Sequence, residues 1–393
     1  MRIALAEDDR EGEIAQLGAE HAAALSSTGL VQVVPVDGDR WRILTRGRVG
    51  AAAVDSVEVV VAPKVGISRL LFLLGYAANP GFRPEDVEGV VDSDVWPAIA
   101  ETLCRHAERA VVSGVLQGYV VVEEALALIR GRIRVSDQMS QRQGMLLPVE
   151  VRYDEYSPDI AENRVLRSAL RRILTVPRLR SDVRARLLHV DGRLDGVATL
   201  PAGVPLPQWR PTRLNQSYHA ALRLGELVLR YQSFEVGRAG MRIAAFVVDM
   251  AAAFEDFVGT ALREAWRVQP GETREQFPVN LDVDGSVRMY VDVVHVVDGH
   301  PQIVADAKYK LEATSGRYPN ADQYQMLAYC TALDKPVGWL VYAQGTGRAV
   351  ERRIRNSPVS IVEYPLDLAA PPAQLLEQVA HLAQIAHERS QRT

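Results

Sequence analysis

Apolar and polar residues alternate in short runs over the first part of the chain, a pattern that predicts β-strands separated by turns such as Asp37-Gly38. Apolar residues at helical spacing then predict helices over residues 69–77 and 96–112. We therefore expect a β-rich N-terminal domain with helices over residues 1–115. Its best strand candidates are residues 30–36, 41–44 and 57–61.

The middle of the chain is predicted to be helical and basic, and we treat residues 116–235 as a region for contact with a partner or with DNA. Helical spacing covers residues 159–174 and 217–231, and a proline-rich connector lies between them at residues 192–213. Upstream we expect three short elements: a hairpin-like element at residues 118–122, a helix at residues 123–129 and an exposed loop or ribbon at residues 131–145.

The last third of the chain predicts the element order α-β-β-β-α-β within a domain over residues 236–393. A helix with one apolar stripe comes first. Residues 289–308 then alternate on either side of Asp298-Gly299, a strong two-residue hairpin signal. The remaining elements are a helix at residues 321–333, strands at 337–342 and 360–364, and a C-terminal helix at 372–388.

Length and composition limit the classes of function. At 393 residues the chain is too long for one ordinary core, and 48% hydrophobic with 24% charged residues is typical of a globular protein. The formal net charge of −4 excludes a generally basic nucleic-acid binder. Two distant cysteines, the absence of a signal-peptide pattern and acidic residues within the most apolar stretch predict a cytoplasmic protein without a membrane segment.

The predicted hairpin carries the strongest chemical signal. It would bring Asp292 close to Asp306 and Lys308, which lie on the strand after the turn. Two carboxylates and one ammonium at a common point suit Mg²⁺-dependent hydrolysis of a phosphodiester, because hard cations take oxygen ligands and a lysine can orient the attacking water. The alternative is an ordinary solvent-facing strand, since Asp-x-Lys triplets are common.

Residues on the neighbouring helices favour the catalytic alternative. Glu255 borders the apolar stripe of the helix before the hairpin. Gln325 and Tyr329 stand four residues apart on the helix after it and so share one face. An amphipathic helix without a special role would also explain that pair.

Together these residues resemble the PD-(D/E)xK nuclease superfamily, in its RecB-like branch with a Q-x-x-x-Y helix. The surrounding sequence resembles the McrC family, the nuclease subunit of McrBC modification-dependent restriction systems, over roughly residues 57–345. One position departs from the superfamily, because Val291 stands where a proline usually precedes the first aspartate. The segments that carry the resemblance are residues 62–65, 70–77, 118–119, 130–133, 153–164, 254–258, 306–310 and 322–329.

The resemblance implies an α/β fold. Its N-terminal part would be α+β, a β-rich and helical region that binds the partner. The C-terminal part would be a restriction-endonuclease-like core, with a central mixed sheet flanked by helices. The site would hold one or two Mg²⁺ ions, with Mn²⁺ as a substitute. Its metal ligands would be Asp292, Asp306 and the Ala307 carbonyl, and Glu255 would support a second ion or a coordinated water.

The other site residues have expected roles in such a nuclease. Lys308 would orient the attacking water or balance the developing charge. Gln325 and Tyr329 would position Lys308 or the phosphate backbone, and Lys310 would contact a phosphate.

The family also implies a partner, an AAA+ GTPase of McrB type that forms a hexameric ring and recognises modified DNA. This chain has no Gly-Lys dipeptide and hence no Walker A loop, so the partner would bind the GTP. We expect the segment 130–142 to insert into the ring and stimulate GTP hydrolysis, although a solvated loop explains it equally well. Its arginines are Arg130, Arg132, Arg134 and Arg142.

A second basic stretch has two interpretations of equal weight. Residues 161–190 contain eight arginines and only two acidic residues, and Arg164, Arg167 and Arg171 fall on a predicted helix. They would form either a solvated helix face or a surface that guides double-stranded DNA by its phosphates, with strong salt dependence.

The leading hypothesis is a Mg²⁺-dependent endonuclease subunit of a GTP-driven restriction complex that cleaves methylcytosine-containing DNA in antiviral defence. One alternative is a non-catalytic activator or scaffold of the AAA+ ring with a vestigial nuclease fold. The intact Asp292, Asp306 and Lys308 argue against it. The other alternative is a stand-alone RecB-like repair nuclease, which the McrC-like sequence upstream disfavours.

Overall fold

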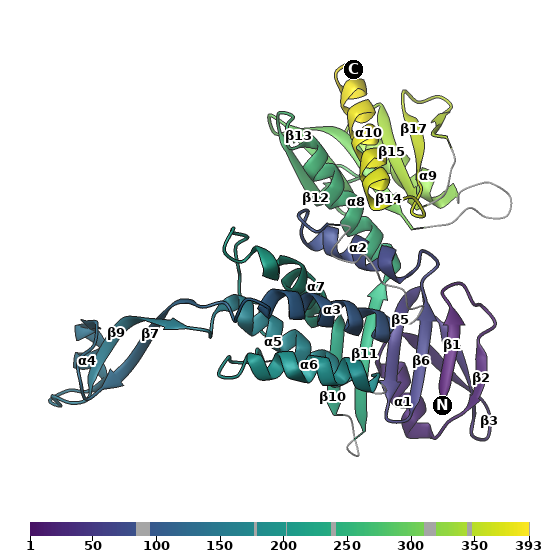
Figure 1. The fold of residues 1–393 in the computed structure, drawn as a ribbon. Helices are drawn as coiled ribbons and strands as arrows, with labels where there is room; N and C mark the ends of the chain where they lie inside the picture. Colours follow the sequence, from purple (N-terminus) through teal and green to yellow (C-terminus); the bar gives the residue numbers. More distant parts are fainter. Residues whose placement is uncertain are drawn as a thin grey trace. The chain divides into compact units, whose positions relative to one another are not determined.

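The computed structural model describes residues 1–83, 95–176, 179–201, 203–236, 241–309, 320–343 and 348–392. The chain forms two compact units, which Figure 1 traces by colour along the sequence. Unit 1 combines Met1–Ala98 with Glu235–Thr393, and unit 2 is Ile99–Phe234. Both ends of the chain therefore belong to one unit, and the segment between them forms the other.

The N-terminal part of unit 1 is built on a five-stranded sheet in the order β1-β6-β5-β11-β10. β1 pairs with β6 in parallel, whereas β5 pairs with both β6 and β11 in antiparallel fashion. β11 lies far along the chain, so this sheet contains both chain segments of unit 1. The strands are β1 (Arg2–Ala6), β5 (Arg48–Val54), β6 (Val57–Ala62), β10 (Gln232–Val236) and β11 (Arg242–Asp249).

Close approach of β5 and β11 explains one glycine. Gly50 has a φ of 134°, and a Cβ atom there would lie 1.9 Å from the Phe246 carbonyl oxygen. A side chain at this position would therefore push the two strands apart. Around the sheet lie α1 (Ala19–Ser27), α2 (Ile67–Ala78) and a small sheet of β2 (Glu13–Gln16), β3 (Val31–Asp37) and β4 (Arg40–Thr45).

Unit 2 consists mainly of helices. Its three-stranded sheet forms a long ribbon that extends away from these helices (Figure 1). The predicted helix at residues 123–129 is wrong, because β7 continues to Leu126 and pairs with β9 along its whole length. Pairing across the ribbon overrides the helical propensity of Glu123-Glu124-Ala125-Leu126. The elements are α3 (Val95–Val111), β7 (Gly118–Leu126), β8 (Arg132–Ile133), α4 (Val135–Gln141), β9 (Val149–Ser157), α5 (Ala161–Leu174), α6 (Ser181–Arg193) and α7 (His219–Tyr231).

The C-terminal part of unit 1 is a six-stranded mixed sheet in the order β12-β13-β14-β15-β17-β16. The predicted order α-β-β-β-α-β is confirmed, with further strands and a C-terminal helix after it. Its elements are α8 (Met250–Trp266), β12 (Glu272–Asn280), β13 (Arg288–Val297), β14 (His300–Lys308), α9 (Asn320–Ala332), β15 (Val337–Ala343), β16 (Val350–Arg353), β17 (Ser360–Leu366) and α10 (Pro372–Ser390).

Helices cover both faces of this mixed sheet. On one face Met326 and Tyr329 of α9 pack against Leu340 and Tyr342 of β15 in a buried cluster. α8 and α10 pack together on the other face, where Trp266 Nε1 donates a hydrogen bond to the Ala383 carbonyl oxygen at 2.9 Å. Among the described residues no helix is long and apolar enough to span a membrane.

Candidate active site

The predicted hairpin is present as β13 and β14, which pair in antiparallel fashion from Val293–Ala305 to the turn. Asp298 and Gly299 both have positive φ angles, 49° and 78°, which is the geometry that an Asp-Gly hairpin turn requires. The backbone pairing of β13 with β14 ends at Val293 and Ala305. Next to it, the Ala307 amide donates a hydrogen bond to Asp292 Oδ2 at 3.0 Å, so a side chain takes the place of a backbone acceptor. The strands thus bring Asp292 next to the Asp306-Ala307-Lys308 triplet.

Asp306 is the most deeply buried acid of the candidate site, with a residue exposure of 1%. Its Oδ2 lies 2.6 Å from Lys308 Nζ, and the alternation of β14 places the two side chains on one face. Its Oδ1 accepts no hydrogen bond from any residue that the structure describes. A buried carboxylate oxygen without a donor is costly, so this position is suited to a bound cation or a donor from a ligand.

Electrostatic repulsion among the acids is strong. Burial, and then the neighbouring Asp292 carboxylate, raise the pKa of Asp306 well above its ordinary value. The same two causes, in the same order, raise the pKa of Glu255 on α8 to about 7. Burial lowers the pKa of Lys308, but the carboxylates of Asp306, Asp292 and Glu255 together raise it above its usual value. Among the residues that the structure describes, one ammonium therefore faces three acids, and a second positive charge would relieve their repulsion.

Glu255 lies on helix α8, which begins directly after β11 ends. Asp249 caps the helix by accepting hydrogen bonds from the Ala251 and Ala252 amides at 3.1 and 3.3 Å. One turn later Glu255 is half-buried within the electrostatic reach of Asp292 and Lys308.

The groups at this site would bind a hard cation through carboxylate and backbone carbonyl oxygens together, and not through side chains alone. Among the described residues no three His, Cys, Asp or Glu side chains already form a metal-binding group. The fit rests instead on oxygen atoms: the carboxylates of Asp292 and Asp306, the second of which has an Oδ1 that accepts no hydrogen bond from a described residue, and the backbone carbonyl of Ala307.

Gln325 and Tyr329 contact the strand that carries Asp292. The buried Tyr329 hydroxyl donates a hydrogen bond to the Tyr290 carbonyl oxygen of β13 at 2.6 Å, and it accepts one from Gln325 Nε2 at 2.6 Å. Burial, and then the Asp306 carboxylate, raise the pKa of Tyr329 to about 12, so the phenol keeps its proton for the bond to β13. In the described structure this pair contacts the β13 backbone rather than Lys308.

Gln276 on β12 is a site residue that the sequence did not reveal. Its side-chain amide donates a hydrogen bond to Asp292 Oδ1 at 3.1 Å, and its backbone has a φ of 49°. Asp292 is thus held through both of its oxygens. No spacing signal marks Gln276, because the contact depends on an irregularity of β12 that a strand pattern does not contain. Lys310, expected to contact a phosphate, lies outside the described residues.

The arginines of segment 130–142 lie at the far end of the ribbon in unit 2, and most of them have partners. Arg130 stacks on the Tyr153 ring at 4.2 Å, Arg134 pairs with Glu123 and Asp137, and Arg142 pairs with Glu150 at 2.8 Å. Arg132 is exposed on β8. Residues of this segment line an open cleft of about 950 Å³.

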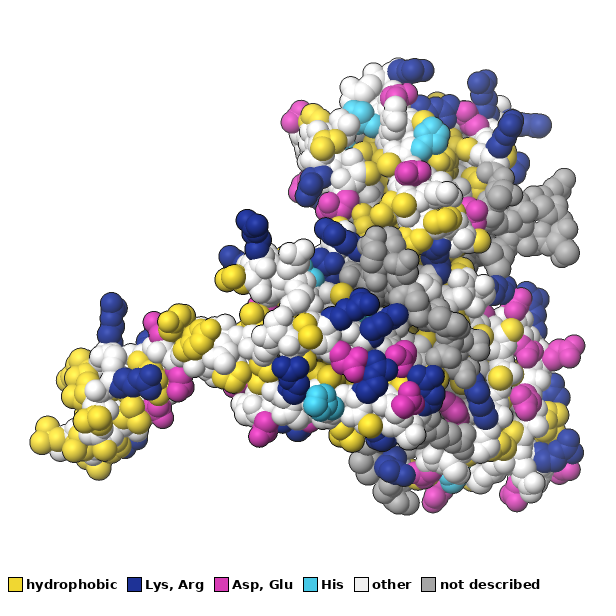
Figure 2. Space-filling model, in the orientation of Figure 1, with side chains coloured by type: hydrophobic (Ala, Val, Ile, Leu, Met, Phe, Trp, Pro, Cys, Tyr) yellow, Lys and Arg dark blue, Asp and Glu magenta, His cyan; other side chains and the backbone are white. Residues whose placement is uncertain are grey.

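Apolar side chains gather over the same end of the ribbon, as Figure 2 shows at its left edge. Leu128 is 83% exposed and Leu146 is 90% exposed. Exposed apolar patches of this kind mark sites of association with another macromolecule. The other exposed members of this ribbon-tip patch are Ile129, Ile133, Val135, Met139, Met145 and Leu147.

The three arginines predicted on the helical face are engaged by carboxylates. Arg164 makes two hydrogen bonds to Asp159, each at 2.7 Å. Arg167 is buried and contacts Asp191 at 3.3 Å, and Arg171 contacts the same carboxylate at 3.1 Å. Of the two interpretations, these contacts favour a structural role over a free phosphate-binding surface.

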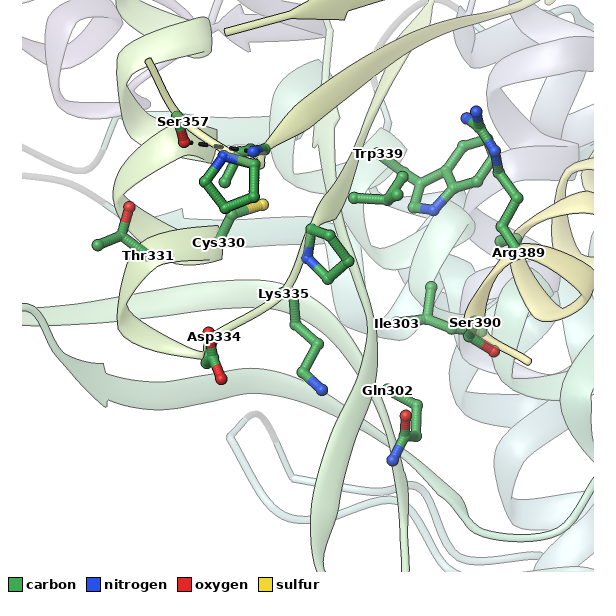
Figure 3. A pocket seen from close by; sticks show the side chains of 15 residues that line it. Gln302, Ile303, Cys330, Thr331, Asp334, Lys335, Trp339, Ser357, Arg389 and Ser390 are labelled. Carbon is green, nitrogen blue, oxygen red and sulfur yellow. Dashed lines mark hydrogen bonds between the residues drawn. The ribbon is translucent and has the colours of Figure 1, made fainter. Parts of the chain in front are cut away.

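A pocket of about 560 Å³ is lined by side chains that include Gln302, Trp339 and Arg389 (Figure 3). Gln302 and Ile303 line it at the start of the strand, whereas Asp306 and Lys308 lie at its end. The carboxylate cluster is therefore not part of this cavity.

Comparisons with known proteins agree with this architecture. The family model for the McrBC 5-methylcytosine restriction system component matches residues 43–343, which is more than half of the chain. A chain from the refined half-complex of the tetradecameric assembly of Thermococcus gammatolerans McrB AAA+ hexamers with bound McrC has a TM-score of 0.60 at 18% identity. That match covers 98% of this chain and 100% of the other. At that identity it shows the fold alone.

A second solved structure, the cryo-EM structure of the Thermococcus gammatolerans McrBC complex, matches with a TM-score of 0.41 at 18% identity, over 67% of this chain and 88% of the other. The search of curated proteins gave no match.

Proposed function

This chain belongs to the family of McrBC 5-methylcytosine restriction system components, and from that premise we propose that it is the Mg²⁺-dependent endonuclease subunit of a GTP-driven complex. Its substrate would be double-stranded DNA that contains methylcytosine. The observation that carries the proposal is the convergence of Asp292, Asp306 and Lys308 where the ladder between β13 and β14 ends.

The site residues divide the work of phosphodiester hydrolysis. Asp292, Asp306 and the Ala307 carbonyl would hold Mg²⁺, with Mn²⁺ as a substitute, and Glu255 would support a second ion or a coordinated water. A bound Mg²⁺ polarises the phosphate and lowers the pKa of the attacking water. Lys308, positively charged beside Asp306, stabilises negative charge that develops on the phosphate oxygens.

Two contacts keep the first carboxylate in place for this chemistry. Gln276 and the Ala307 amide each donate to one oxygen of Asp292, and Tyr329 fixes the β13 backbone two residues before it. Such support matters because a displacement of about 1 Å in a catalytic group costs on the order of 100-fold in rate.

We further propose that the ribbon of β7 and β9 docks on an AAA+ GTPase of McrB type and stimulates its GTP hydrolysis, with the partner binding the GTP. The ribbon-tip patch presents bare apolar side chains beside the arginine-lined cleft, a combination suited to a protein partner. The solved structure that this fold matches contains McrB AAA+ hexamers with bound McrC.

Substitutions at the site test the nuclease proposal. In complex with a cognate GTPase, Asp292→Ala and Lys308→Ala should each lower cleavage of methylated DNA by about 1,000-fold or more, because the first removes a metal ligand and the second the ammonium beside Asp306. GTP hydrolysis by the partner should persist. Asp284→Ala, an exposed acid on the loop before β13, is the matched control and should cleave normally. Undiminished cleavage by either site variant would contradict the site assignment, whereas GTPase stimulation without cleavage by the wild-type complex would favour the scaffold alternative.

A substitution on the ribbon tests the partner proposal. Leu146→Asp places a charge in the ribbon-tip patch and should abolish stimulation of GTP hydrolysis, since burial of an unpaired carboxylate opposes docking. Val204→Asp, another exposed apolar residue of unit 2 outside the ribbon, is its control. Stimulation by Leu146→Asp equal to that by the wild type would contradict docking through this patch. Cleavage without any GTPase partner would instead favour a stand-alone nuclease.

A further inference from the structure

A glutamate of the N-terminal sheet reaches the strand that carries the catalytic triplet. Glu7 directly follows β1, and its Oε2 accepts a hydrogen bond from the Tyr309 hydroxyl at 3.2 Å. Tyr309 follows Lys308 at the end of β14. The two residues are separated by 302 positions in sequence, so only the tertiary fold of unit 1 brings them together.

The position of Glu7 is fixed by its own sheet. Its amide donates to the Ala62 carbonyl oxygen at 3.1 Å, which extends the parallel ladder of β1 and β6 by one bond. Pro63 then ends β6 because it has no amide hydrogen. The next amide, that of Lys64, turns to the same Glu7 Oε2 at 3.0 Å. The segment 62–65, which contributes to the family resemblance without an assigned role, therefore builds the receptor for the glutamate.

Tyr309 is held on its other side by the helix that carries Glu255. Its ring lies 6.1 Å from the Phe254 ring on α8. That helix in turn packs on α2, where Phe257 contacts the Tyr76 ring at 5.6 Å and Thr260 donates to the Ala77 carbonyl oxygen at 3.1 Å. The end of β14 and helix α8 thus share one support, which comes from the N-terminal part of the unit.

We propose that Glu7 and Tyr309 are positioning residues for the nuclease site, so that the five-stranded N-terminal sheet helps to complete the active site. The backbone ladder between β14 and β15 extends to Lys308 and Tyr342. Immediately after it, the Tyr309 side chain anchors the strand end through Glu7. Loss of this anchor lets Lys308 and the Ala307 carbonyl shift relative to Asp292. The inference rests on the proposed nuclease function.

The test uses the full chain in its complex with a cognate GTPase. Tyr309→Phe removes the hydroxyl and keeps the ring against Phe254, and Glu7→Ala removes the acceptor. Each should lower kcat for cleavage about 10-fold with an unchanged KM for DNA, because the anchor acts on placement of the catalytic groups and not on DNA binding. Glu7→Gln keeps an acceptor oxygen and should restore most of the rate.

The double variant Glu7→Ala/Tyr309→Phe should be no slower than the slower single variant, because both substitutions break the same bond. Asp8→Ala is the matched acidic control: this exposed carboxylate pairs with Lys64 Nζ at 3.0 Å on the same turn. Tyr324→Phe, on the exposed face of α9, is the tyrosine control. Unchanged kcat in both single variants, an equal loss in Asp8→Ala, or multiplicative losses in the double variant would overturn the proposal.

A second readout does not depend on cleavage. Mn²⁺ should raise the Tm of the wild-type chain and leave that of Asp306→Ala unchanged, and the rise should be clearly smaller for Glu7→Ala and recovered in Glu7→Gln. A full Mn²⁺-induced rise in Glu7→Ala would overturn the positioning role even if the variant were inactive. Failure of the wild-type complex to cleave methylated DNA would instead reject the proposed nuclease function, and the Tm series would still decide the anchor.

Discussion

Two buried charges in this protein have opposite surroundings. Arg167 in unit 2 lies between the carboxylates of Asp191 and Asp195 and also donates to the Val197 carbonyl oxygen. Asp306 in unit 1 has one ammonium close to its Oδ2, a second acid nearby and no donor for its Oδ1 among the described residues. The first charge is compensated within the fold, as a structural ion pair must be. The second is compensated only in part, which is typical of ionisable groups at functional sites.

The comparison also separates two kinds of basic sequence. The arginine-rich helices of unit 2 suggest nucleic-acid binding on composition, yet most of their described guanidinium groups are engaged within the unit. Some contact acids, whereas Arg172 and Arg184 donate to backbone carbonyl oxygens. Arg186, for example, contacts both Glu101 and Glu108, at 2.9 and 2.6 Å. Local charge density therefore predicts a partner less well than the number of charges left without a counterion.

The largest expected stability effect is at the compensated charge. Arg167→Met removes the guanidinium, so that among the described residues Asp191 keeps only the half-exposed Arg171 and the Val197 carbonyl oxygen loses its donor. The free energy of unfolding should therefore fall by about 3 kcal/mol. Urea denaturation of the purified chain measures this value. His189→Ala, two residues before Asp191 on α6, is the control, because His189 forms no ion pair with the residues that the structure describes. A loss below about 0.5 kcal/mol would mean that solvent already screens the Arg167 pair.

A substitution at Asp306, whose charge is compensated only in part, should change the free energy of unfolding in the opposite direction. Asp306→Asn without added metal should raise the free energy of unfolding by about 1 kcal/mol at neutral pH. The amide is neutral at every pH, whereas burial and Asp292 disfavour the ionised form that the carboxyl takes in the unfolded chain. Cleavage should be lost in the same variant. Equal or lower stability of Asp306→Asn would show that the Lys308 contact fully compensates the carboxylate.

The gain should depend on pH in a definite direction. The pKa of Asp306 is raised in the folded protein, so the folded state holds its proton when the unfolded state has already lost it. Stability of the metal-free wild type relative to Asp306→Asn should therefore fall as the pH rises from about 4, and level off above the raised pKa. Urea titrations across this range measure the difference. A difference that does not change with pH would contradict the raised pKa.

The smallest expected effect concerns the helical face. Arg171 contacts Asp191 and is half exposed, so Arg171→Ala should change the free energy of unfolding by less than about 1 kcal/mol. It should also leave the salt dependence of DNA binding unchanged. A salt slope reduced by about one unit, measured by binding at several salt concentrations, would restore the interpretation that this face guides DNA.

Local sequence signals predicted the C-terminal elements well because each signal was complete within a few residues. Asp298-Gly299 specifies its turn through two positive φ angles, and Met289, Val291 and Val293 alternate with polar residues in the first half of β13. The helix expected at residues 123–129 failed for the opposite reason. Its local propensity is helical, and only pairing with β9, more than twenty residues away, makes it a strand.

The sequence by itself determined the kinds of chemical group, their order along the chain and the hairpin that joins Asp292 to Asp306 and Lys308. Only the tertiary structure decided which charges are compensated and which residues support the site. Gln276 on β12 and Glu7 after β1 have no motif of their own, and they reach the site because β12 pairs with β13 and the N-terminal sheet meets the end of β14. The spacing of apolar residues shows which face of a helix or strand is buried, but it does not specify which distant segment packs against that face.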